Sequence, residues 1–552
     1  MPALLDPLLL RLPYRRSPRL AALFVLSAIA CWGEPGAHGA ASPALPPASA
    51  DFLDEEPVLA PAQPPVPAPP EAQTPAPALV PIARPTPAPS DLPTQLAPEL
   101  GALSSWVKTR KGDLGFALRD LGSGRELMGE GAGHALNPAS NQKLVTAAVA
   151  LSLLGPSHRF HVGVLGKISS GVASRLVLRG NGDPSFSYDD LRELTSRLVA
   201  LGLKRVTGDI LVDHGAFDDQ YTPPAFEQQP SEWSPFRAPV SGVSLNRNAV
   251  TLHVFPTQPG QPARLEFEPP GYVSVQGEVR TEKGKKRDHV GLTMRPQGTA
   301  LSARVSGDVP AGDTVVHLSK RIENPEIFAA AVLKRELISA GVAVQGQAAR
   351  GGEDETDELV GRDSATLAEL TNQLGKASDN FYAETLFKAL GARAKGAPGS
   401  AEKASAAIGE WLAAHGLSED GLQIRNGSGL YDANRISARM LTRLLEVAYL
   451  DPAISAAYQE QLAVGGLDGT LRSRFYALRN RRSVHAKTGT LNKVVALSGY
   501  VFGPEQQTGV SFSIMVSGIA GEHGEARKRI DALVLGISDR LWKREVATLA
   551  SR

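Results

Sequence analysis

The sequence Asn137-Pro-Ala-Ser-Asn-Gln-Lys-Leu-Val-Thr-Ala-Ala-Val-Ala-Leu-Ser-Leu-Leu154 predicts a buried helix in the middle of a large domain. All but two residues from 144 to 154 are apolar, and Gly155-Pro156 ends the run. A helix that is apolar on nearly every side belongs in a core. Ser140 and Lys143 lie one turn apart at its start, so we expect their hydroxyl and amine on one face. In such a dry place a lysine can lose its proton and activate a hydroxyl.

The same two residues also have an ordinary structural explanation. Serine is a preferred N-cap, and a lysine one turn later is often only solvated surface. The pattern Ser-x-x-Lys also occurs at Ser105 to Lys108 and at Ser400 to Lys403. A catalytic interpretation of Ser140 therefore needs support from the rest of the chain.

Composition excludes several classes of protein. A chain of 552 residues predicts about two to four domains, and 42% hydrophobic with 21% charged residues is typical of soluble globular protein. A net charge of +1 gives no reason to expect nucleic acid or an anionic membrane as a partner. Cys31 is the only cysteine, which excludes an intrachain disulfide, a Cys₄ zinc site and a cysteine nucleophile in the folded body. The 11 histidines show no metal-ligand spacing, so we expect no metal and no cofactor.

Residues 1–40 have the features of an export signal. Arg15, Arg16 and Arg19 precede an apolar run over residues 20–30, which is too short for a stable bilayer anchor. Ala28-Ile-Ala30 offers a cleavage site just before Cys31. Simple secretion to the periplasm or the exterior is favoured over lipidation, because Ala28 stands where lipoprotein signals usually carry leucine. A membrane tether is expected only if Cys31 is lipidated, and no later segment is apolar enough to predict a transmembrane helix.

Residues 41–97 predict a tether rather than a domain. The stretch 43–98 holds 18 of the 42 prolines, mixed mainly with alanine. Proline at this density prevents helices and sheet ladders and favours extended polyproline II. We expect this segment to hold an active body away from a surface, with a Pro-rich ligand for a binding partner as the alternative.

The folded body is expected to have three parts: residues 98–155, a β-rich insert over 156–360, and residues 361–552. Strands are predicted at 113–121, 125–128, 206–213, 249–255, 272–275 and 314–318, with one helix in the insert at 325–340. Helices are predicted at 371–390, 401–415, 437–448 and 525–541. The three strands at 483–491, 494–502 and 509–517 are expected to be antiparallel neighbours. No repeat of 20–50 residues is visible.

Two further motifs give the serine–lysine pair a chemical context. Ser378-Asp-Asn380 precedes a helix-like run, and Lys487-Thr-Gly489 lies in a predicted strand. Together with Ser140-x-x-Lys143, this set resembles the signature of penicillin-binding proteins and class A β-lactamases. Ser244-Leu-Asn246 also matches Ser-x-Asn, but we interpret it as a loop turn. The three motifs occur in the order and the settings that the chemistry needs.

The residue types predict individual roles in acyl transfer. Ser140 is the expected nucleophile, and Lys143 takes its proton if burial and a second cation draw the lysine pKa toward ~7–8. Lys487 can be that cation and can also attract a substrate carboxylate. Ser378 can relay a proton to the leaving amine. Asn380 can hold both Lys143 and the substrate amide, since its side chain donates and accepts hydrogen bonds.

The residues after Lys487 are expected to bind substrate. Thr488 offers a hydroxyl to the carboxylate, and Gly489 leaves room for close approach along the strand edge. The backbone N–H groups of Ser140 and Thr490 would form an oxyanion hole, worth about 3–4 kcal/mol per donor in comparable sites.

Over residues 98–552 the chain resembles a more specific branch. This is the D-alanyl-D-alanine carboxypeptidase/endopeptidase family of class C low-molecular-mass penicillin-binding proteins (peptidase family S13). Ser378 follows Ser140 at a far greater separation than in compact β-lactamases, as the large insertion of that family implies. Further matching stretches are Gly180-Asn-Gly-Asp-Pro184, Pro325-Glu-Ile-Phe-Ala-Ala-Ala-Val-Leu333 and Gly466-Leu-Asp-Gly-Thr-Leu471. One departure is Asn426-Gly-Ser-Gly-Leu430, followed by Tyr431-Asp432, where the family usually begins with Asp and continues Leu-Ser-Arg.

The resemblance implies an α/β (α+β) fold: a transpeptidase domain like that of penicillin-binding proteins and serine β-lactamases, with an antiparallel sheet flanked by helices and a β-rich inserted domain. It implies cleavage of peptidoglycan stem peptides and cross-links through an acyl-enzyme on Ser140, with β-lactams as covalent inhibitors. We expect the insert to be a separate packing unit that shapes access for cross-linked peptidoglycan and supplies no catalytic group. A β-lactamase is one alternative, although no Glu-x-x-x-Asn loop is convincingly placed to activate water. An idle envelope protein that binds wall peptides or senses β-lactams is the other.

Overall fold

The computed structural model describes residues 80–284, 287–312 and 314–549. The predicted export signal, Cys31 and residues 41–79 of the predicted tether lie outside this part of the chain. Among the residues described, no helix is long and apolar enough to cross a membrane.

A six-stranded antiparallel sheet forms the centre of the catalytic part. Its strands run in the order β17 (Ala463–Val464), β18 (Val484–Leu491), β19 (Val494–Phe502), β20 (Gly509–Ser517), β1 (Asp113–Asp120) and β2 (Glu126–Glu130). The predicted antiparallel arrangement of the last three long strands is confirmed, and β19 and β20 have the predicted bounds. Every residue of β19 is buried, because helices cover both faces of the sheet.

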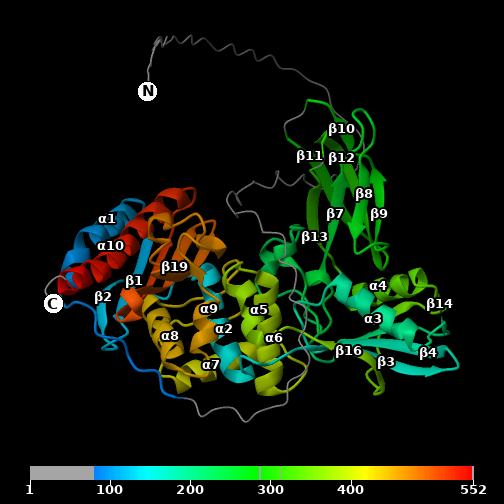
Figure 1. The fold of residues 1–552 in the computed structure, drawn as a ribbon, viewed down its shortest axis with the longest axis horizontal. Helices are drawn as coiled ribbons and strands as arrows, with labels where there is room; N and C mark the ends of the chain where they lie inside the picture. The colour runs from blue at the N-terminus through cyan, green and yellow to red at the C-terminus, as the bar shows by residue number, and fades with distance from the viewer. Residues whose placement is uncertain (1–79, 285–286, 313, 550–552) are drawn as a thin grey trace, which may run out of the picture. The chain divides into compact units, whose positions relative to one another are not determined.

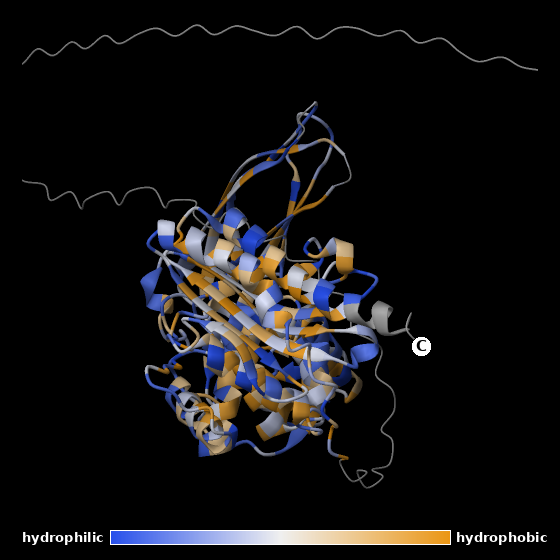
Figure 2. Ribbon diagram, turned by 90° about the vertical axis from the view of Figure 1, so that its left-hand side faces the viewer, coloured by the Kyte–Doolittle hydropathy of each residue, from blue (hydrophilic) through white to orange (hydrophobic). Residues whose placement is uncertain are grey.

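Alternate residues of the strands contribute to two cores. Val495, Leu497 and Val501 pack against α1 (Leu92–Thr109) and α10 (His523–Leu549), which Figure 1 shows side by side on one face. Residues of the opposite parity, such as Tyr500, face a second group of helices. These are α2 (Gln142–Leu154), α5 (Leu367–Gly375), α6 (Asn380–Lys395), α7 (Ala401–Ala414), α8 (Ala438–Leu450) and α9 (Ser455–Glu460). In Figure 2 the strands are largely orange, the hydrophobic end of the scale. The expected antiparallel sheet flanked by helices is confirmed.

The buried helix predicted from the sequence is α2. Its residues 142–151 are all buried, and the Tyr458 hydroxyl donates a 3.2 Å hydrogen bond to the Leu144 carbonyl. The α-helix begins only at Gln142, and Ser140 lies in the short 3₁₀ helix η1 (Ala139–Asn141) before it. The other 3₁₀ helices are η2 (Phe226–Gln228), η3 (Pro235–Arg237), η4 (Asn246–Asn248), η5 (Gly469–Leu471), η6 (Tyr476–Leu478) and η7 (Pro504–Gln506).

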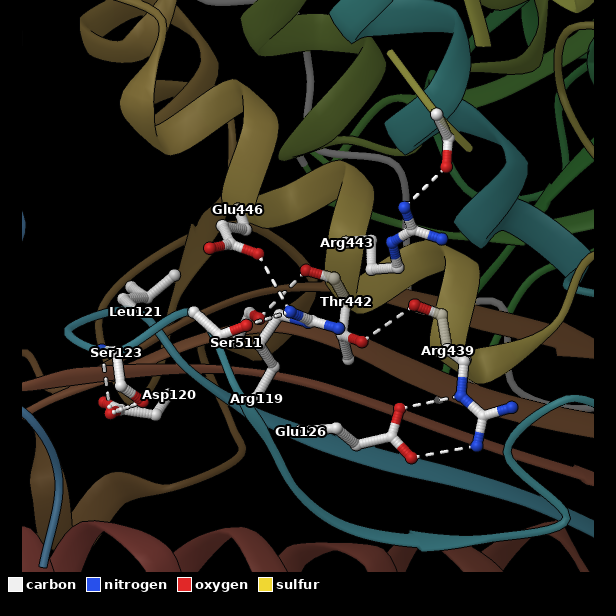
Figure 3. A network of polar contacts seen from close by, with 12 residues as sticks. Arg119, Asp120, Leu121, Ser123, Glu126, Arg439, Thr442, Arg443, Glu446 and Ser511 are labelled. Carbon is white, nitrogen blue, oxygen red and sulfur yellow. Dashed lines mark hydrogen bonds and ion pairs between the residues drawn. The ribbon is translucent and has the colours of Figure 1, made fainter. Parts of the chain in front are cut away.

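Helix α8 is joined to the β1–β2 hairpin by polar contacts (Figure 3). Arg439 on α8 makes a two-pronged ion pair with Glu126 on β2, at 2.8 and 2.9 Å. Arg119 on β1 lies 3.1 Å from Glu446 on the same helix. These pairs hold α8 against β1 and β2. In the order of the sheet, these are the two strands farthest from β18.

The folded body begins earlier than the sequence predicts. Helix α1 starts at Leu92, so the boundary predicted between residues 97 and 98 falls inside this helix. Upstream of it, Arg84 donates hydrogen bonds to the Leu121 carbonyl (2.8 Å) and to Glu446 (2.7 Å). Proline favours an extended chain but does not prevent packing, and residues 80–97 therefore belong to the folded body rather than to the tether.

The insert is β-rich, as predicted. Its largest sheet contains β3 (His161–Ser169), β4 (Val172–Gly180), β5 (Arg205–Val206), β6 (Ile210–Asp213), β14 (Ala343–Val344), β15 (Ala348–Arg350) and β16 (Glu358–Asp363). Helices α3 (Tyr188–Ala200) and α4 (Pro325–Ser339) pack with it in one core. Helix α3 was not predicted from the sequence, although Ser187 and Asp190 form a capping box at its start.

Two smaller sheets complete the insert. One has the order β13 (Val316–Arg321), β7 (Ala249–Phe255) and β8 (Arg264–Glu268). The other contains β9 (Val273–Gly277), β10 (Arg280–Glu282), β11 (His289–Gln297) and β12 (Ala300–Pro310). Part of the predicted insert does not pack with these sheets. Phe217, Ala238 and Val240 are buried in the same core as α2, so this segment belongs to the catalytic core.

Candidate active site

The first motif is set by a left-handed turn before α2. Ala139 has a φ of 47°, and its backbone N–H donates to the Asn137 side chain at 2.9 Å. This turn places Ser140 half-buried at the helix start, while Lys143 in the first turn is fully buried. The Lys143 amine lies 3.1 Å from the Ser140 hydroxyl oxygen. The predicted proximity of the two side chains is therefore present.

The Lys143 amine also reaches two oxygens of neighbouring segments. It donates to Oδ1 of Asn380 at 2.6 Å and to the backbone carbonyl of Ser428 at 2.9 Å. These two oxygens can only accept hydrogen bonds, whereas the Ser140 hydroxyl can donate or accept. A neutral amine can thus keep both carbonyl bonds and still accept the Ser140 proton. The geometry suits a general base that acts on Ser140.

The second motif lies in a break between two helices. The sequence predicts one helix over 371–390, but α5 ends at Gly375 and α6 begins at Asn380. The prediction of one continuous helix is wrong. Ser378 adopts a left-handed φ of 58°, which interrupts the helix. Asp379 then caps α6, because its side chain accepts a hydrogen bond from the Tyr382 N–H at 3.0 Å. Because of this break, Ser378 lies next to Lys487 on β18, and Asn380 lies next to Lys143.

Lys487 of the third motif meets Ser378. Its amine donates to the Ser378 hydroxyl at 2.6 Å and to the Thr488 carbonyl at 2.8 Å, and its side chain is almost fully buried. The predicted residues thus form two hydrogen-bonded groups, one around Lys143 and one around Lys487. The backbone from Ser378 to Asn380 joins them.

The remaining predicted residues lie along β18. The Thr488 hydroxyl donates to that of Thr470 at 2.9 Å, and the exposed Thr490 hydroxyl accepts from Arg527 at 3.4 Å. Gly489 has a second reason to be glycine. A Cβ there would lie 2.9 Å from the Pro138 carbonyl oxygen and 3.1 Å from the Ala139 Cβ. The missing side chain therefore lets β18 approach the turn that carries Ser140.

A buried carboxylate that was not predicted from the sequence, Glu384, holds the segment whose Ser428 carbonyl accepts a hydrogen bond from Lys143. Glu384 is almost fully buried and accepts from the backbone N–H groups of Gly427 (3.1 Å) and Ser428 (2.8 Å). Burial raises its pKa, while the hydrogen bonds from Ser428 and Gly427 and the charge of Lys143 oppose that rise. Its position four residues after Asn380, on the same helix face, was a usable signal.

The other serine–lysine pairs have structural explanations. Ser400 is the N-cap of α7 and accepts from the Lys403 N–H at 3.1 Å, while Ser105 is an exposed residue within α1. The Lys403 amine bonds the Gly396 and Pro398 carbonyls, at 2.8 Å each. Of the three Ser-x-x-Lys pairs, the one at Ser140 contacts the second motif, through Lys143 and Asn380, and the second motif contacts the third through Ser378 and Lys487.

Comparisons with known proteins show which family this chain resembles. The D-Ala-D-Ala carboxypeptidase 3 (S13) family matches residues 106–538. A D-alanyl-D-alanine carboxypeptidase of Actinomadura sp. is 31% identical over 449 residues, which cover 78% of this chain and 82% of that protein. The D-alanyl-D-alanine carboxypeptidase DacB of Haemophilus influenzae is 23% identical, covering 70% and 82% of the two chains.

The fold has a counterpart among solved structures. The crystal structure of penicillin binding protein 4 (dacB) from Haemophilus influenzae superimposes with a TM-score of 0.67 at 22% identity, covering 79% of this chain and 99% of that one. This similarity confirms the predicted penicillin-binding-protein fold. With the family match over most of the described chain, it leads to one assignment: this chain belongs to the D-Ala-D-Ala carboxypeptidase 3 (S13) family.

Proposed function

We propose that this chain is a serine-type D-Ala-D-Ala carboxypeptidase that also cleaves peptidoglycan cross-links, and that it forms its acyl-enzyme on Ser140. The observation that carries the proposal is the 3.1 Å contact between the Ser140 hydroxyl and an amine that is already held by Asn380 and Ser428. The relatives support it, since two of them are named D-alanyl-D-alanine carboxypeptidases.

The proposed reaction starts with proton transfer from Ser140 to neutral Lys143. The serine oxygen attacks the carbonyl carbon of the penultimate D-alanine, and the backbone N–H groups of Ser140 and Thr490 stabilise the oxyanion. The C–N bond then breaks, and the proton that Lys143 took from Ser140 is relayed through Ser378 to the leaving amine. Water then hydrolyses the resulting ester. This step restores the Ser140 hydroxyl and frees the shortened peptide.

Binding of the terminal carboxylate is assigned to the third motif. Lys487 supplies a buried positive charge, and Thr488 lies next to it with a hydroxyl that can turn from Thr470 to the ligand. In carboxypeptidase action the leaving group is free D-alanine. In cross-link cleavage it is the partner stem peptide, so the same bond chemistry serves both reactions.

The proposed substrate places the enzyme outside the cytoplasm, where the wall polymer lies. The export signal predicted at residues 1–40 supports this location, and a membrane tether would require lipidation of Cys31. β-Lactams, which mimic the D-alanyl-D-alanine end, should acylate Ser140 and inhibit the enzyme.

Release of D-alanine is the direct test. The purified protein is incubated with a pentapeptide stem ending in D-Ala-D-Ala, and in parallel with a stem ending in D-Ala-L-Ala, and the free terminal alanine (D or L) released from each is measured. The proposal predicts release from the first substrate only, and none from Ser140→Ala. Covalent labelling by penicillin without any D-alanine release would instead favour an idle binding protein, and rapid catalytic hydrolysis of penicillin would favour a β-lactamase.

A further inference from the structure

The Ser-x-Asn sequence in the insert forms an unusual turn. Asn246, Arg247 and Asn248 have φ angles of 48°, 55° and 50°, so three consecutive residues other than glycine are left-handed. Such residues are strained and persist only where their surroundings enforce this conformation. Here the Asn246 side chain accepts from the Tyr188 N–H at 2.7 Å. The Asn248 side chain donates to the Pro239 carbonyl at 2.8 Å.

This turn presents Arg247 to the second catalytic motif. The guanidinium lies 2.8 Å from the Asp379 carboxylate and 5.3 Å from the centre of the Tyr382 ring. The Arg247 and Asp379 side chains are 33% and 13% exposed, so the ion pair is partly withdrawn from solvent. Burial lowers the pKa of Arg247 and the charge of Asp379 raises it, with a net rise.

Asp379 lies between two residues of the proposed machinery. One of its oxygens caps α6 through the Tyr382 N–H, and the other binds Arg247. Directly before it, Ser378 has the left-handed φ of 58°. Two strained turns, one in the insert and one in the catalytic part, therefore meet at a single ion pair.

The segment 217–240, which packs in the catalytic core, contacts α6 at two other points. Asp218 lies 2.6 Å from the buried Lys388 amine, further along the helix. The carbonyl of Phe236 accepts from the Asn380 amide at 3.5 Å. The start of α6 is thus held by Arg247 of the insert, and the helix is also held by this segment of the catalytic core.

We infer that Arg247 is a positioning residue for acyl transfer: by holding Asp379, it keeps the Ser378–Asn380 turn in the conformation that presents Ser378 to Lys487 and Asn380 to Lys143. This inference rests on the proposed function. It gives the insert a part in the reaction, beyond the shaping of substrate access that the sequence predicts.

Arg247→Met tests the inference because methionine keeps an apolar stem and removes the charge. The matched control is Arg264→Met, since Arg264 also lies in the insert, over the ring of Phe255 at 3.8 Å and paired with Glu266. The measurements are kcat and KM for D-alanine release, the rate of acylation by a fluorescent penicillin, and thermal unfolding.

We expect Arg247→Met to lower kcat and the acylation rate by roughly 10- to 100-fold, the loss expected when reacting groups shift by about 1 Å, with little change in KM. Arg264→Met should leave these rates within about twofold, and Arg247→Lys should recover part of the loss because it keeps the charge. Wild-type rates in Arg247→Met, or an equal loss in Arg264→Met, would overturn the inference.

Asp379→Asn provides a second route if Arg247→Met folds poorly. Its amide oxygen can still cap α6, so the variant loses the charge of the pair and little else. It should show the same loss of kcat, and adding Arg247→Met should lower the rate no further. Additive losses would contradict the inference. A wild-type protein that is neither acylated nor active refutes the proposed function, whereas an active wild type with an active Arg247→Met refutes only the role of Arg247.

Discussion

The Lys143 amine lies 2.6 Å from Oδ1 of Asn380, a residue 237 positions further along the chain. The two side chains come from α2 and α6, which pack together in the largest core of the catalytic part. Because both helices are buried, the position of the amine depends on core packing rather than on a flexible loop. This is the arrangement expected of a preorganised site.

Ser140→Ala should abolish covalent labelling by a fluorescent penicillin and leave thermal unfolding nearly unchanged. The side chain is half-buried and its loss removes one hydroxyl next to Lys143, with no change in backbone preference. Ser105→Ala, an exposed position in α1 with the same Ser-x-x-Lys pattern, is the matched control and should label normally. Labelling that persists in Ser140→Ala would show that another residue is the nucleophile.

Glu384→Gln should slow acylation and move the acid limb of its pH–rate profile to lower pH. The amide group can accept from only one of the two backbone N–H groups that Glu384 now binds, which loosens the Ser428 carbonyl that holds Lys143. Burial raises the pKa of Glu384 and the charge of Lys143 opposes that rise, and Lys388 also faces this carboxylate. Because such coupling is reciprocal, loss of the carboxylate favours the neutral, basic form of Lys143.

The control for this experiment is Glu410→Gln, which removes the same charge from an exposed ion pair with Lys395 on the neighbouring helices. It should change neither the rate nor the pH profile, since exposed pairs contribute little. An acid limb that moves to higher pH in Glu384→Gln, or that does not move, would contradict the assignment.

The sequence predicted the sheet better than the turns. The bounds of β19 and β20 were correct because long apolar strands separated by short loops leave little choice of pairing. The three motifs were found because their residue types are tied to the chemistry. The break before α6 was missed because the helical pattern continues through it, and only the capping by Asp379 reveals the interruption. Arg247 was missed because its partner is remote in sequence, and no local pattern specifies such a contact. The partners of Glu384 are remote as well, so its spacing from Asn380 on one helix face was the usable signal.

Gly489→Ala should reduce acylation more than tenfold and destabilise the fold by about 1–3 kcal/mol, the usual cost of overpacking a well-packed site. The added methyl group would meet the backbone of Pro138 at 2.9 Å, so the turn that carries Ser140 has to move. Gly101→Ala in α1, where a Cβ meets nothing within 4 Å, should be neutral or stabilising by up to about 1 kcal/mol. Acylation at the wild-type rate in a normally folded Gly489→Ala would contradict the packing argument.

Truncation should distinguish the two parts of the predicted tether. A chain that starts at residue 80 should release D-alanine at the full-length rate and unfold at the same temperature. A chain that starts at residue 98 loses Arg84, which binds Glu446, and the fully buried Leu92 and Leu96. Since each buried leucine contributes about 1.5–3 kcal/mol, we expect this shorter chain to be several kcal/mol less stable by urea unfolding. Equal stability of the two chains would show that residues 80–97 are dispensable.

The lifetime of the penicillin adduct separates a wall peptidase from a resistance enzyme. After attack on a D-alanyl-D-alanine bond, the leaving amine diffuses away and water can enter on that side. In a β-lactam the leaving nitrogen stays tethered to the acyl group and blocks that approach, so fast hydrolysis needs a separate carboxylate to activate water. The carboxylate within the second motif, Asp379, is already engaged with Arg247, and Glu384, four residues after Asn380, is engaged with the Ser428 N–H.

We therefore expect the Ser140 adduct to persist for minutes or longer, while peptide turnover is much faster. A hydrolysis rate of roughly one per hundred seconds corresponds to a barrier of about 20 kcal/mol. Intact-protein mass spectrometry after a short pulse of penicillin measures the adduct directly, and its mass shift should be absent in Ser140→Ala. Loss of the adduct within about a second, with steady hydrolysis of penicillin, would require a water-activating group that the contacts of Asp379 and Glu384 do not provide, and would identify the protein as a β-lactamase.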